Sequence, residues 1–342
     1  MIDLTADPVL EQSAQQVVDL AATPPFFHEL DPNEARRDLE FLQSAAADDA
    51  AVTMRLVSVP TRDHTTVTLR LILPLGTNSP LPIVLFMHGG AWVLGSARTH
   101  HRLMRDIAVG AAVAIAFPEY DRAPEAKYPT ALEQCWAVAE WLTAHGDEVG
   151  LDSRTVLIAG DCVGGNLAAA VALLAIQRPG VSFAAQILLY PAVDTDFDSP
   201  SYRKFAEGFS TRRDSMIWGF DQYAQREQWD DVYVAPLRAT IAELRHLPPA
   251  LIVTAEADVV RDEGEAYAAR LREAGVEVTA VRYTGTIHHF MVLDSLRNSS
   301  ASKAALAQTI AYITNALPRA RRPISRSPVV RRGEPNQRNR IK

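Results

Sequence analysis

The chain has 342 residues, of which 48% are hydrophobic and 22% are charged, and its formal net charge at pH 7 is −7. This composition can bury a sizeable core, which favours one large domain over two independent ones. No apolar run reaches the roughly 18 residues of a membrane span, the N-terminus is acidic where a signal peptide would be basic, and two cysteines cannot build a disulfide framework. We therefore expect a cytoplasmic protein with no membrane partner.

Apolar periodicity divides the chain into a helical start, a hairpin and a long β/α alternation. Residues 1–50 are expected to be helical, with Asp31-Pro32 as the start of a helix over 33–46. Residues 52–59 and 65–73 predict an antiparallel hairpin. Further strands are expected near 82–87, 112–117, 155–160, 184–190, 250–255 and 277–283, and helices near 98–109, 128–145, 164–177, 261–274 and 300–316. This alternation predicts an α/β fold with a mostly parallel, doubly wound, eight-stranded sheet.

A glycine-bounded turn with a cysteine at its centre, Gly160-Asp161-Cys162-Val163-Gly164, follows the strand near 155–160. A segment rich in alanine, leucine and valine comes next and predicts a helix. This strand, turn and helix are typical of the nucleophile elbow G-x-S-x-G, which lifts the nucleophile above the sheet. Cys162 stands where the elbow normally has serine.

Three further strands end in residues that suit such a nucleophile. The first leads into His88–Trp92, with the sequence H-G-G-A-W, which is similar to the H-G-G-G type of oxyanion loop. The second is followed by Asp258, and the third by His288 and His289. The order along the chain is therefore nucleophile, acid and histidine.

These motifs, with the segments Tyr120–Glu125 (Y-D-R-A-P-E) and Ile287–Phe290 (I-H-H-F), resemble the hormone-sensitive-lipase-like group of bacterial carboxylesterases. That group has the α/β-hydrolase fold with a helical cap, and its patterns at these two places are Y-R-L-A-P-E and I-H-G-F. The resemblance spans most of the chain. It implies a nucleophile, a base and an orienting acid at Cys162, His288 and Asp258. It also implies oxyanion donors among the backbone N–H groups of Gly89, Gly90 or Ala91, together with that of Val163.

The chain departs from the family pattern at four positions that touch the chemistry. Cys162 replaces serine, Val163 replaces alanine, Ala91 replaces the third glycine, and His289 replaces a glycine. Several simultaneous departures favour a natural variant over an engineered serine-to-cysteine change. Ala91 keeps an unstrained N–H donor only if its φ is negative, since a positive φ would strain it.

A cysteine beside a histidine can transfer its proton to the imidazole, and its acyl-enzyme would be a thioester. Thioesters exchange readily with thiols and amines. We therefore expect a hydrolase that acts on a small-molecule ester, thioester or lactone through a covalent acyl-enzyme. Two alternatives stay open, namely an acyltransferase or cyclase of specialised metabolism that takes an acyl-thioester donor, and a ligand-binding relative without catalysis.

Several residues have a competing interpretation. Asp262 is the alternative acid, because Asp258 could instead cap the helix that follows it. Cys135 lies in a helical segment and is expected to be a buried thiol. His88 is expected to hold its loop in shape while the backbone amides act on the substrate. Candidates for the substrate pocket are Trp92, Trp218 and His289.

The predicted domains are an N-terminal helical cap segment at 1–50, a catalytic core at 51–193 and 248–317, a cap insertion at 194–247 and a disordered tail at 318–342. The insertion carries a predicted helix over 212–228 that would fold over the elbow. The tail has nine basic residues and one acidic residue, which does not by itself predict nucleic-acid binding. No C-x-x-C motif or histidine cluster suggests a metal, and no cofactor is expected.

Overall fold

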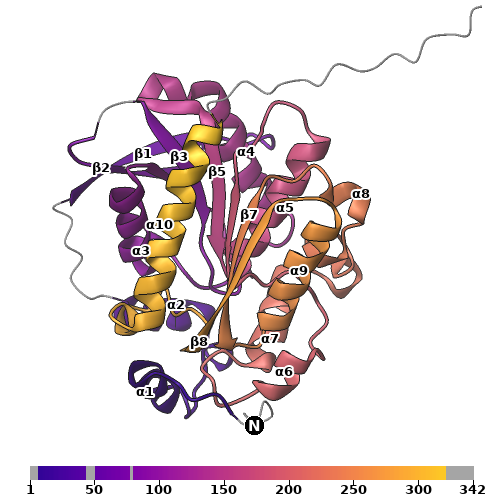
Figure 1. Cartoon of the computed structure of the whole chain (residues 1–342). Helices are drawn as coiled ribbons and strands as arrows, with labels where there is room; N and C mark the ends of the chain where they lie inside the picture. The colour runs from indigo at the N-terminus through magenta and orange to yellow at the C-terminus, as the bar shows by residue number, and fades with distance from the viewer. Residues whose placement is uncertain (1–6, 44–50, 78–79, 321–342) are drawn as a thin grey trace, which may run out of the picture.

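The computed structural model describes residues 7–43, 51–77 and 80–320, and its centre is an eight-stranded sheet (Figure 1). The strands are β1 Val52–Pro60, β2 Thr66–Pro74, β3 Leu81–Met87, β4 Ala114–Glu119, β5 Leu151–Asp161, β6 Gln186–Leu189, β7 Ala250–Ala257 and β8 Val278–Ile287. Their order across the sheet is β1-β2-β4-β3-β5-β6-β7-β8. Only the pairs β1–β2 and β2–β4 are antiparallel. The predicted hairpin and mostly parallel sheet are confirmed.

The central strands are buried on both faces. All seven residues of β3 are buried, and their sequence is a continuous apolar run, as a parallel strand covered by helices requires. The covering helices are α3 Ala97–Ala111, α4 Thr130–His145, α5 Val163–Gln177, α9 Arg261–Glu273 and α10 Ser300–Ala320. Helices α3 and α10 pack against each other on one side of the sheet, and α5 and α9 lie on the other (Figure 1).

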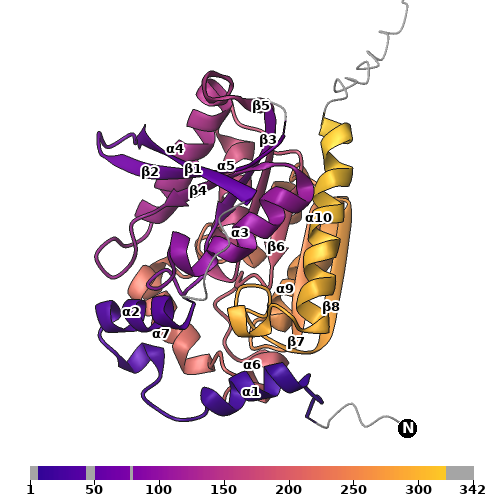
Figure 2. The ribbon, with the colours of Figure 1, turned by 90° about the vertical axis from the view of Figure 1, so that its left-hand side faces the viewer.

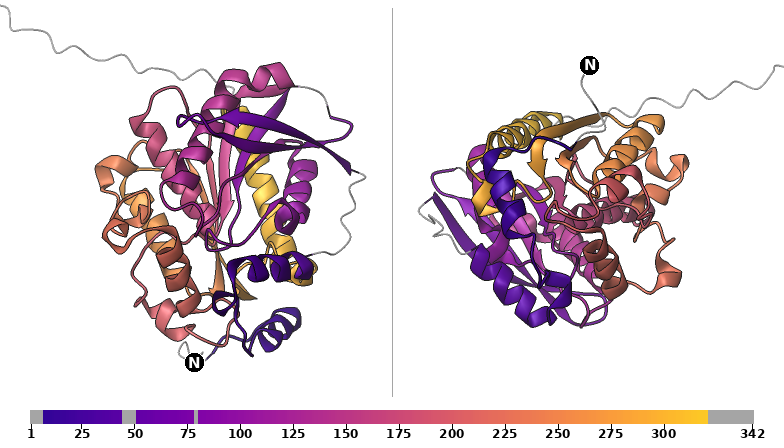
Figure 3. Two further views of the ribbon diagram at one scale, coloured as in Figure 1. Left: turned by 180° about the vertical axis from the view of Figure 1, so that it is seen from behind. Right: turned by 90° about the horizontal axis from the view of Figure 1, so that it is seen from below.

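Two segments far apart in the chain gather at the end of the sheet where β7 and β8 end (Figures 2 and 3). They contain α1 Gln12–Leu20, η1 Phe27–Glu29 and α2 Pro32–Leu42 from the N-terminal part, and α6 Pro200–Lys204 and α7 Arg213–Tyr223 from the insertion. Ser215 Oγ lies 2.9 Å from His28 Nδ1, and the Arg212 guanidinium lies 4.2 Å from the centre of the Phe26 ring. The two segments thus contact each other, as a cap built from both would require.

Parts of the insertion differ from the expected arrangement. The predicted helix over 212–228 is interrupted, because α7 ends at Tyr223 and a separate turn, η4, spans Arg226–Gln228. The Tyr223 carbonyl accepts a hydrogen bond of 2.7 Å from the N–H of Tyr128, and Ala224 then takes an extended conformation. The short helix α8 Ile241–Leu244 contacts α5 and α9 of the core. The domain boundaries themselves stay a prediction.

Both ends of the predicted helical regions can be compared with the structure. Helix α2 begins as predicted, with Pro32 at its first turn and the Asp31 side chain accepting a hydrogen bond from the Asn33 N–H. Helix α10 runs to Ala320, beyond its expected end at 316, while most of the predicted tail at 318–342 lies outside the described residues. No helix in the described ranges is long and apolar enough to cross a membrane.

Candidate active site

Cys162 occupies a sharp turn between β5 and α5. Its φ of 52° and ψ of −121° lie outside the conformations that L-residues normally adopt. The turn is held by hydrogen bonds from Cys162 N–H to the Leu189 carbonyl and from Ala192 N–H to the Cys162 carbonyl. A Cβ at Gly160 would collide with the backbone of Gly164. The two glycines and the strained cysteine therefore form the elbow that the sequence predicts.

Asp258 and His288 meet because their strands end side by side. Ala257, the last residue of β7, pairs with Ile287, the last residue of β8. The next residue on each strand is the acid or the histidine, and His288 Nδ1 lies 2.7 Å from Asp258 Oδ2. Both side chains are buried. The second oxygen of Asp258 accepts a hydrogen bond of 3.0 Å from Val260 N–H, which fixes the carboxylate.

The alternative acid is engaged elsewhere. Asp262 Oδ2 accepts a hydrogen bond from the N–H of Ser201, and its Oδ1 accepts one from Arg261 Nε. Neither contact involves His288. The structure therefore brings Asp258, rather than Asp262, to the histidine.

The other edge of the His288 ring faces the elbow. A ring nitrogen of His288 and the Sγ of Cys162 lie within 4.8 Å of each other, and Nε2 has no hydrogen-bond partner among the described residues. Burial alone would lower the pKa of His288, but the Asp258 carboxylate and the Cys162 thiol outweigh it and raise the pKa well above its ordinary value. The ring can thus hold a proton next to the sulfur.

The loop after β3 presents two amides near the elbow and commits a third. Gly89 N–H donates a hydrogen bond of 2.9 Å to Asp161 Oδ1, so this predicted oxyanion donor is already occupied. In the described chain, the N–H groups of Gly90, Ala91 and Val163 donate to no protein acceptor. Val163 is the first residue of α5, where a free N–H is expected.

Ala91 has a φ of 55°, the positive value that strains an alanine. The cap packs directly on it, because a Cβ built on Gly219 of α7 would lie only 2.7 Å from the Ala91 Cβ. The methyl group added at position 91 is thus accommodated by a glycine in the helix above. This pairing couples the oxyanion loop to the cap.

His88 supports the loop from below. Its Nδ1 lies 2.8 Å from the Gly89 carbonyl oxygen, and its ring stacks on Tyr120 with centroids 4.3 Å apart. Burial and the nearby His100 lower the pKa of His88 to about 3. A ring that stays neutral and fully packed agrees with the predicted structural role.

The three predicted pocket residues lie in different surroundings. Trp92 is buried and stacks on Tyr223 of α7, with ring centroids 4.1 Å apart, so it joins the loop to the cap. Trp218 is a half-buried residue of the same helix. His289 has a φ of 61°, and its ring centroid lies 4.0 Å from that of His288. Of the three, His289 is the one placed against a triad residue.

Asp161 and His100 form a buried pair that the sequence analysis did not single out. Asp161 Oδ1 lies 3.1 Å from His100 Nε2, and neither side chain is exposed by more than 4%. Burial would raise the pKa of Asp161, but His100 and the Gly89 N–H hold it below its ordinary value. An acidic residue at the end of an otherwise apolar strand requires a buried partner, and this requirement was the available signal.

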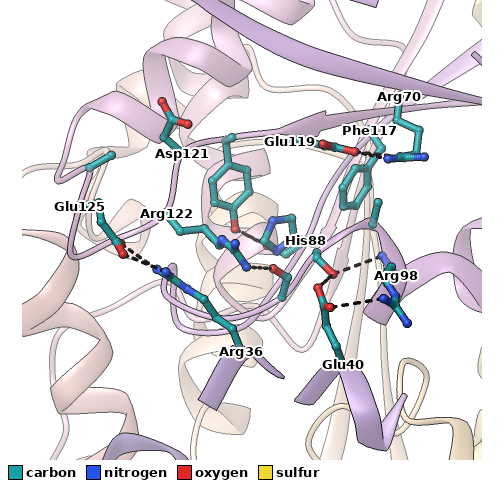
Figure 4. Close-up of a pocket in the computed structure, with 15 residues that line it drawn as sticks. Arg36, Glu40, Arg70, His88, Arg98, Phe117, Glu119, Asp121, Arg122 and Glu125 are labelled. Atoms are coloured by element: carbon teal, nitrogen blue, oxygen red, sulfur yellow. Dashed lines mark hydrogen bonds and ion pairs between the residues drawn. The ribbon is translucent and has the colours of Figure 1, made fainter. Parts of the chain in front are cut away.

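A charged pocket of about 530 Å³ lies on the far side of His88 from the elbow (Figure 4). Its arginines are paired with acids: Arg36 with Glu125, Arg70 with Glu119 and Arg98 with Glu40. The residues that line it do not include Cys162, Asp258 or His288. It is therefore separate from the catalytic arrangement.

Comparisons with known proteins agree with this geometry. A family model described as the α/β hydrolase fold matches residues 84–292, a range that contains the elbow, the acid and the histidine. An ethyl acetate hydrolase of Pseudomonas putida is 32% identical over 277 residues, which cover 79% of this chain and 86% of that protein.

Solved structures give the same result. The chain superposes on a thermostable esterase from Pseudomonas putida ECU1011 with a TM-score of 0.88 and 37% identity, covering 91% of this chain and 99% of that one. For a fungal esterase from Rhizomucor miehei the TM-score is 0.86 and the identity 33%, with 92% and 99% of the two chains covered.

Proposed function

The chain belongs to the α/β-hydrolase fold family, and from this premise we propose that it hydrolyses small carboxylic esters with Cys162 as nucleophile. His288 acts as the base, and Asp258 orients it. The observation that carries the proposal is the buried hydrogen bond of 2.7 Å between Asp258 and His288, which turns the other ring nitrogen toward the elbow. The relatives named as esterases support the substrate class.

Acylation begins with transfer of the Cys162 proton to His288 Nε2. The sulfur then attacks the ester carbonyl carbon, and the carbonyl oxygen becomes negatively charged. Collapse of this tetrahedral intermediate breaks the bond to the alkoxy group, which takes the proton from His288 and leaves as an alcohol. A thioester on Cys162 remains.

Deacylation repeats the sequence with water. His288 removes a proton from the attacking water, and the oxygen adds to the thioester carbonyl. The second tetrahedral intermediate expels the sulfur, which is reprotonated through His288, and a carboxylic acid is released. The buried Asp258 carboxylate stabilises the imidazolium in both halves of the reaction.

The proposed oxyanion hole consists of the N–H groups of Gly90, Ala91 and Val163. These amides have no protein acceptor in the described residues, whereas the Gly89 amide is engaged by Asp161. Amides fixed by the backbone need no reorientation as the charge develops, and each such donor contributes roughly 3–4 kcal/mol to the transition state.

Three side chains narrow the space around the sulfur relative to the family pattern. Ala91, Val163 and His289 stand where smaller residues are usual, and Ala91 is covered by α7. We therefore assign short acyl groups to this site. Acyl transfer is the second candidate, because Cys162 and His288 are each only 1% exposed and a site shielded from water favours another acceptor.

The test is the intact mass of the protein after brief exposure to an activated acetate ester and, separately, to an acetyl thioester. The native chain should gain one acetyl group from the ester and lose it in buffer, whereas Cys162→Ala should gain none. Loss of the group only after addition of a thiol or amine would favour transfer. Equal labelling of the native protein and Cys162→Ala would refute the nucleophile.

A second variant distinguishes the chemistry of sulfur from that of the site. Cys162→Ser should retain or raise hydrolysis of simple esters if the remaining residues form a complete esterase site. Impaired hydrolysis in this variant, in a protein with an unchanged melting temperature, would instead indicate a site specialised for thioesters.

A further inference from the structure

Three potential metal ligands meet at the elbow. The sulfur of Cys162 and one nitrogen each from His288 and His289 all lie within 4.8 Å of one another. They come from the turn after β5 and the turn after β8, which is why spacing along the sequence gave no sign of a metal site. We propose that these three residues bind Zn²⁺ reversibly and that the bound ion blocks the nucleophile.

The donor set suits this ion. Zinc prefers cysteine sulfur and histidine nitrogen, at about 2.3 Å and 2.0–2.1 Å, in tetrahedral geometry. Those bond lengths place neighbouring donors roughly 3.5 Å apart, so side-chain shifts on the order of 1 Å would close the present arrangement. As the zinc–sulfur bond forms, the thiol proton leaves to solvent. The fourth position stays open for water.

One ligand is already oriented. Metal-binding histidines usually donate their second ring N–H to a carboxylate or carbonyl, which fixes the ring and the tautomer. His288 makes this contact through Nδ1 to Asp258 at 2.7 Å, and its Nε2 has no hydrogen-bond partner in the described residues. The negative charges of the thiolate and of Asp258 would balance the charge of the ion.

His289 supplies the ligand that the catalytic arrangement does not need. Its ring lies against His288, with centroids 4.0 Å apart, and within the described chain its ring nitrogens make no hydrogen bond. It has a φ of 61° at a position where glycine is favoured. A histidine kept there despite the backbone cost fits a role for the side chain.

The binding test uses the full-length protein without substrate. Competition with a fluorescent chelator should give one tightly bound Zn²⁺ per chain, and Co²⁺ as a spectroscopic substitute should give a sulfur-to-cobalt absorption band. His289→Gly should weaken Zn²⁺ binding by at least about tenfold, the lower range seen when mere supporting contacts of a metal site are lost. Cys162→Ala should remove the absorption band. The control is His145→Ala, an exposed histidine at the end of α4, which should change neither.

Equal Zn²⁺ affinity in the native protein and His289→Gly, or an unchanged cobalt spectrum in Cys162→Ala, would overturn the proposal. If His289→Gly does not fold, His289→Asn serves instead, because asparagine tolerates a positive φ. The inhibitory consequence rests on the proposed function, but binding does not. Failure of acylation therefore leaves the metal test intact, and failure of metal binding leaves the acylation test intact.

Discussion

Two buried histidines show how similar positions in this fold acquire opposite properties. His88 follows β3 and His288 follows β8, and their exposures are 2% and 1%. Each ring lies against a tyrosine, at 4.3 Å from Tyr120 and 5.0 Å from Tyr190. Burial and His100 lower the pKa of His88 to about 3, whereas the pKa of His288 is raised well above its ordinary value despite the same burial.

The difference lies in the partner of Nδ1. In His88 it is the carbonyl oxygen of Gly89, which is neutral. In His288 it is the carboxylate of Asp258, whose charge stabilises the imidazolium. A buried histidine therefore becomes a proton carrier only when a carboxylate accompanies it. His88 supports the oxyanion loop, and His288 has the electrostatic setting that the proposed mechanism needs.

The largest effect should come from removing the proton carrier. His288→Ala should lower kcat/KM for ester hydrolysis by about 10⁴-fold, because the nucleophile loses its base. Steady-state kinetics on a short-chain ester checks this, with His145→Ala as a control at an exposed site. A loss of less than about tenfold would mean that His288 carries no more chemistry than His88 does.

Removing only the carboxylate charge sharpens the comparison. Asp258→Asn should lower kcat by about 10³-fold, since the ring keeps a neighbour but loses the group that orients and stabilises its charged form. Because Asp258 raises the pKa of His288, the limb of the kcat/KM profile that reports this histidine should move to lower pH. An unchanged profile would contradict the role given to Asp258.

The same comparison predicts how stability depends on pH. His88 takes up no proton in the folded chain until about pH 3, whereas in the unfolded chain it does so near 6.5. Stability should therefore fall as pH decreases through this window, by up to about 1.4 kcal/mol per pH unit for this group and about 3 kcal/mol by pH 4.

Urea unfolding between pH 7 and pH 5 measures this slope. His88→Asn should flatten it by nearly one proton per molecule, whatever the variant's absolute stability, while His145→Ala should leave it unchanged. Parallel curves for the native protein and His88→Asn would show that His88 is not held neutral by the fold.

How much of this could be predicted from the sequence depends on the range of the interactions. The meeting of Asp258 and His288 was predictable, because residues that follow neighbouring parallel strands share one edge of the sheet. Which amide of the oxyanion loop is already engaged was not, since that depends on the rotamer of Asp161 and on His100. Pattern and periodicity contain no information on such pairs.

The interrupted helix and the metal-ligand cluster were missed for a related reason. The helix predicted over 212–228 ends early because Tyr128, about a hundred residues upstream, bonds the Tyr223 carbonyl. The approach of His289 to Cys162 requires both turns to be placed in space. Sequence patterns predict where elements lie, and contacts between distant turns decide where they end and what they can bind.

The smallest expected effect concerns the second thiol. Cys135 lies within α4 with no exposed surface, and burial raises its pKa far above the ordinary value. Cys135→Ala should therefore change kcat/KM by no more than about twofold and lower the free energy of unfolding by about 1 kcal/mol. Acyl labelling and urea unfolding of the same sample measure both quantities. Equal loss of labelling in Cys135→Ala and Cys162→Ala would mean that labelling reports the integrity of the fold, because only Cys162 combines a strained turn with a histidine facing its sulfur.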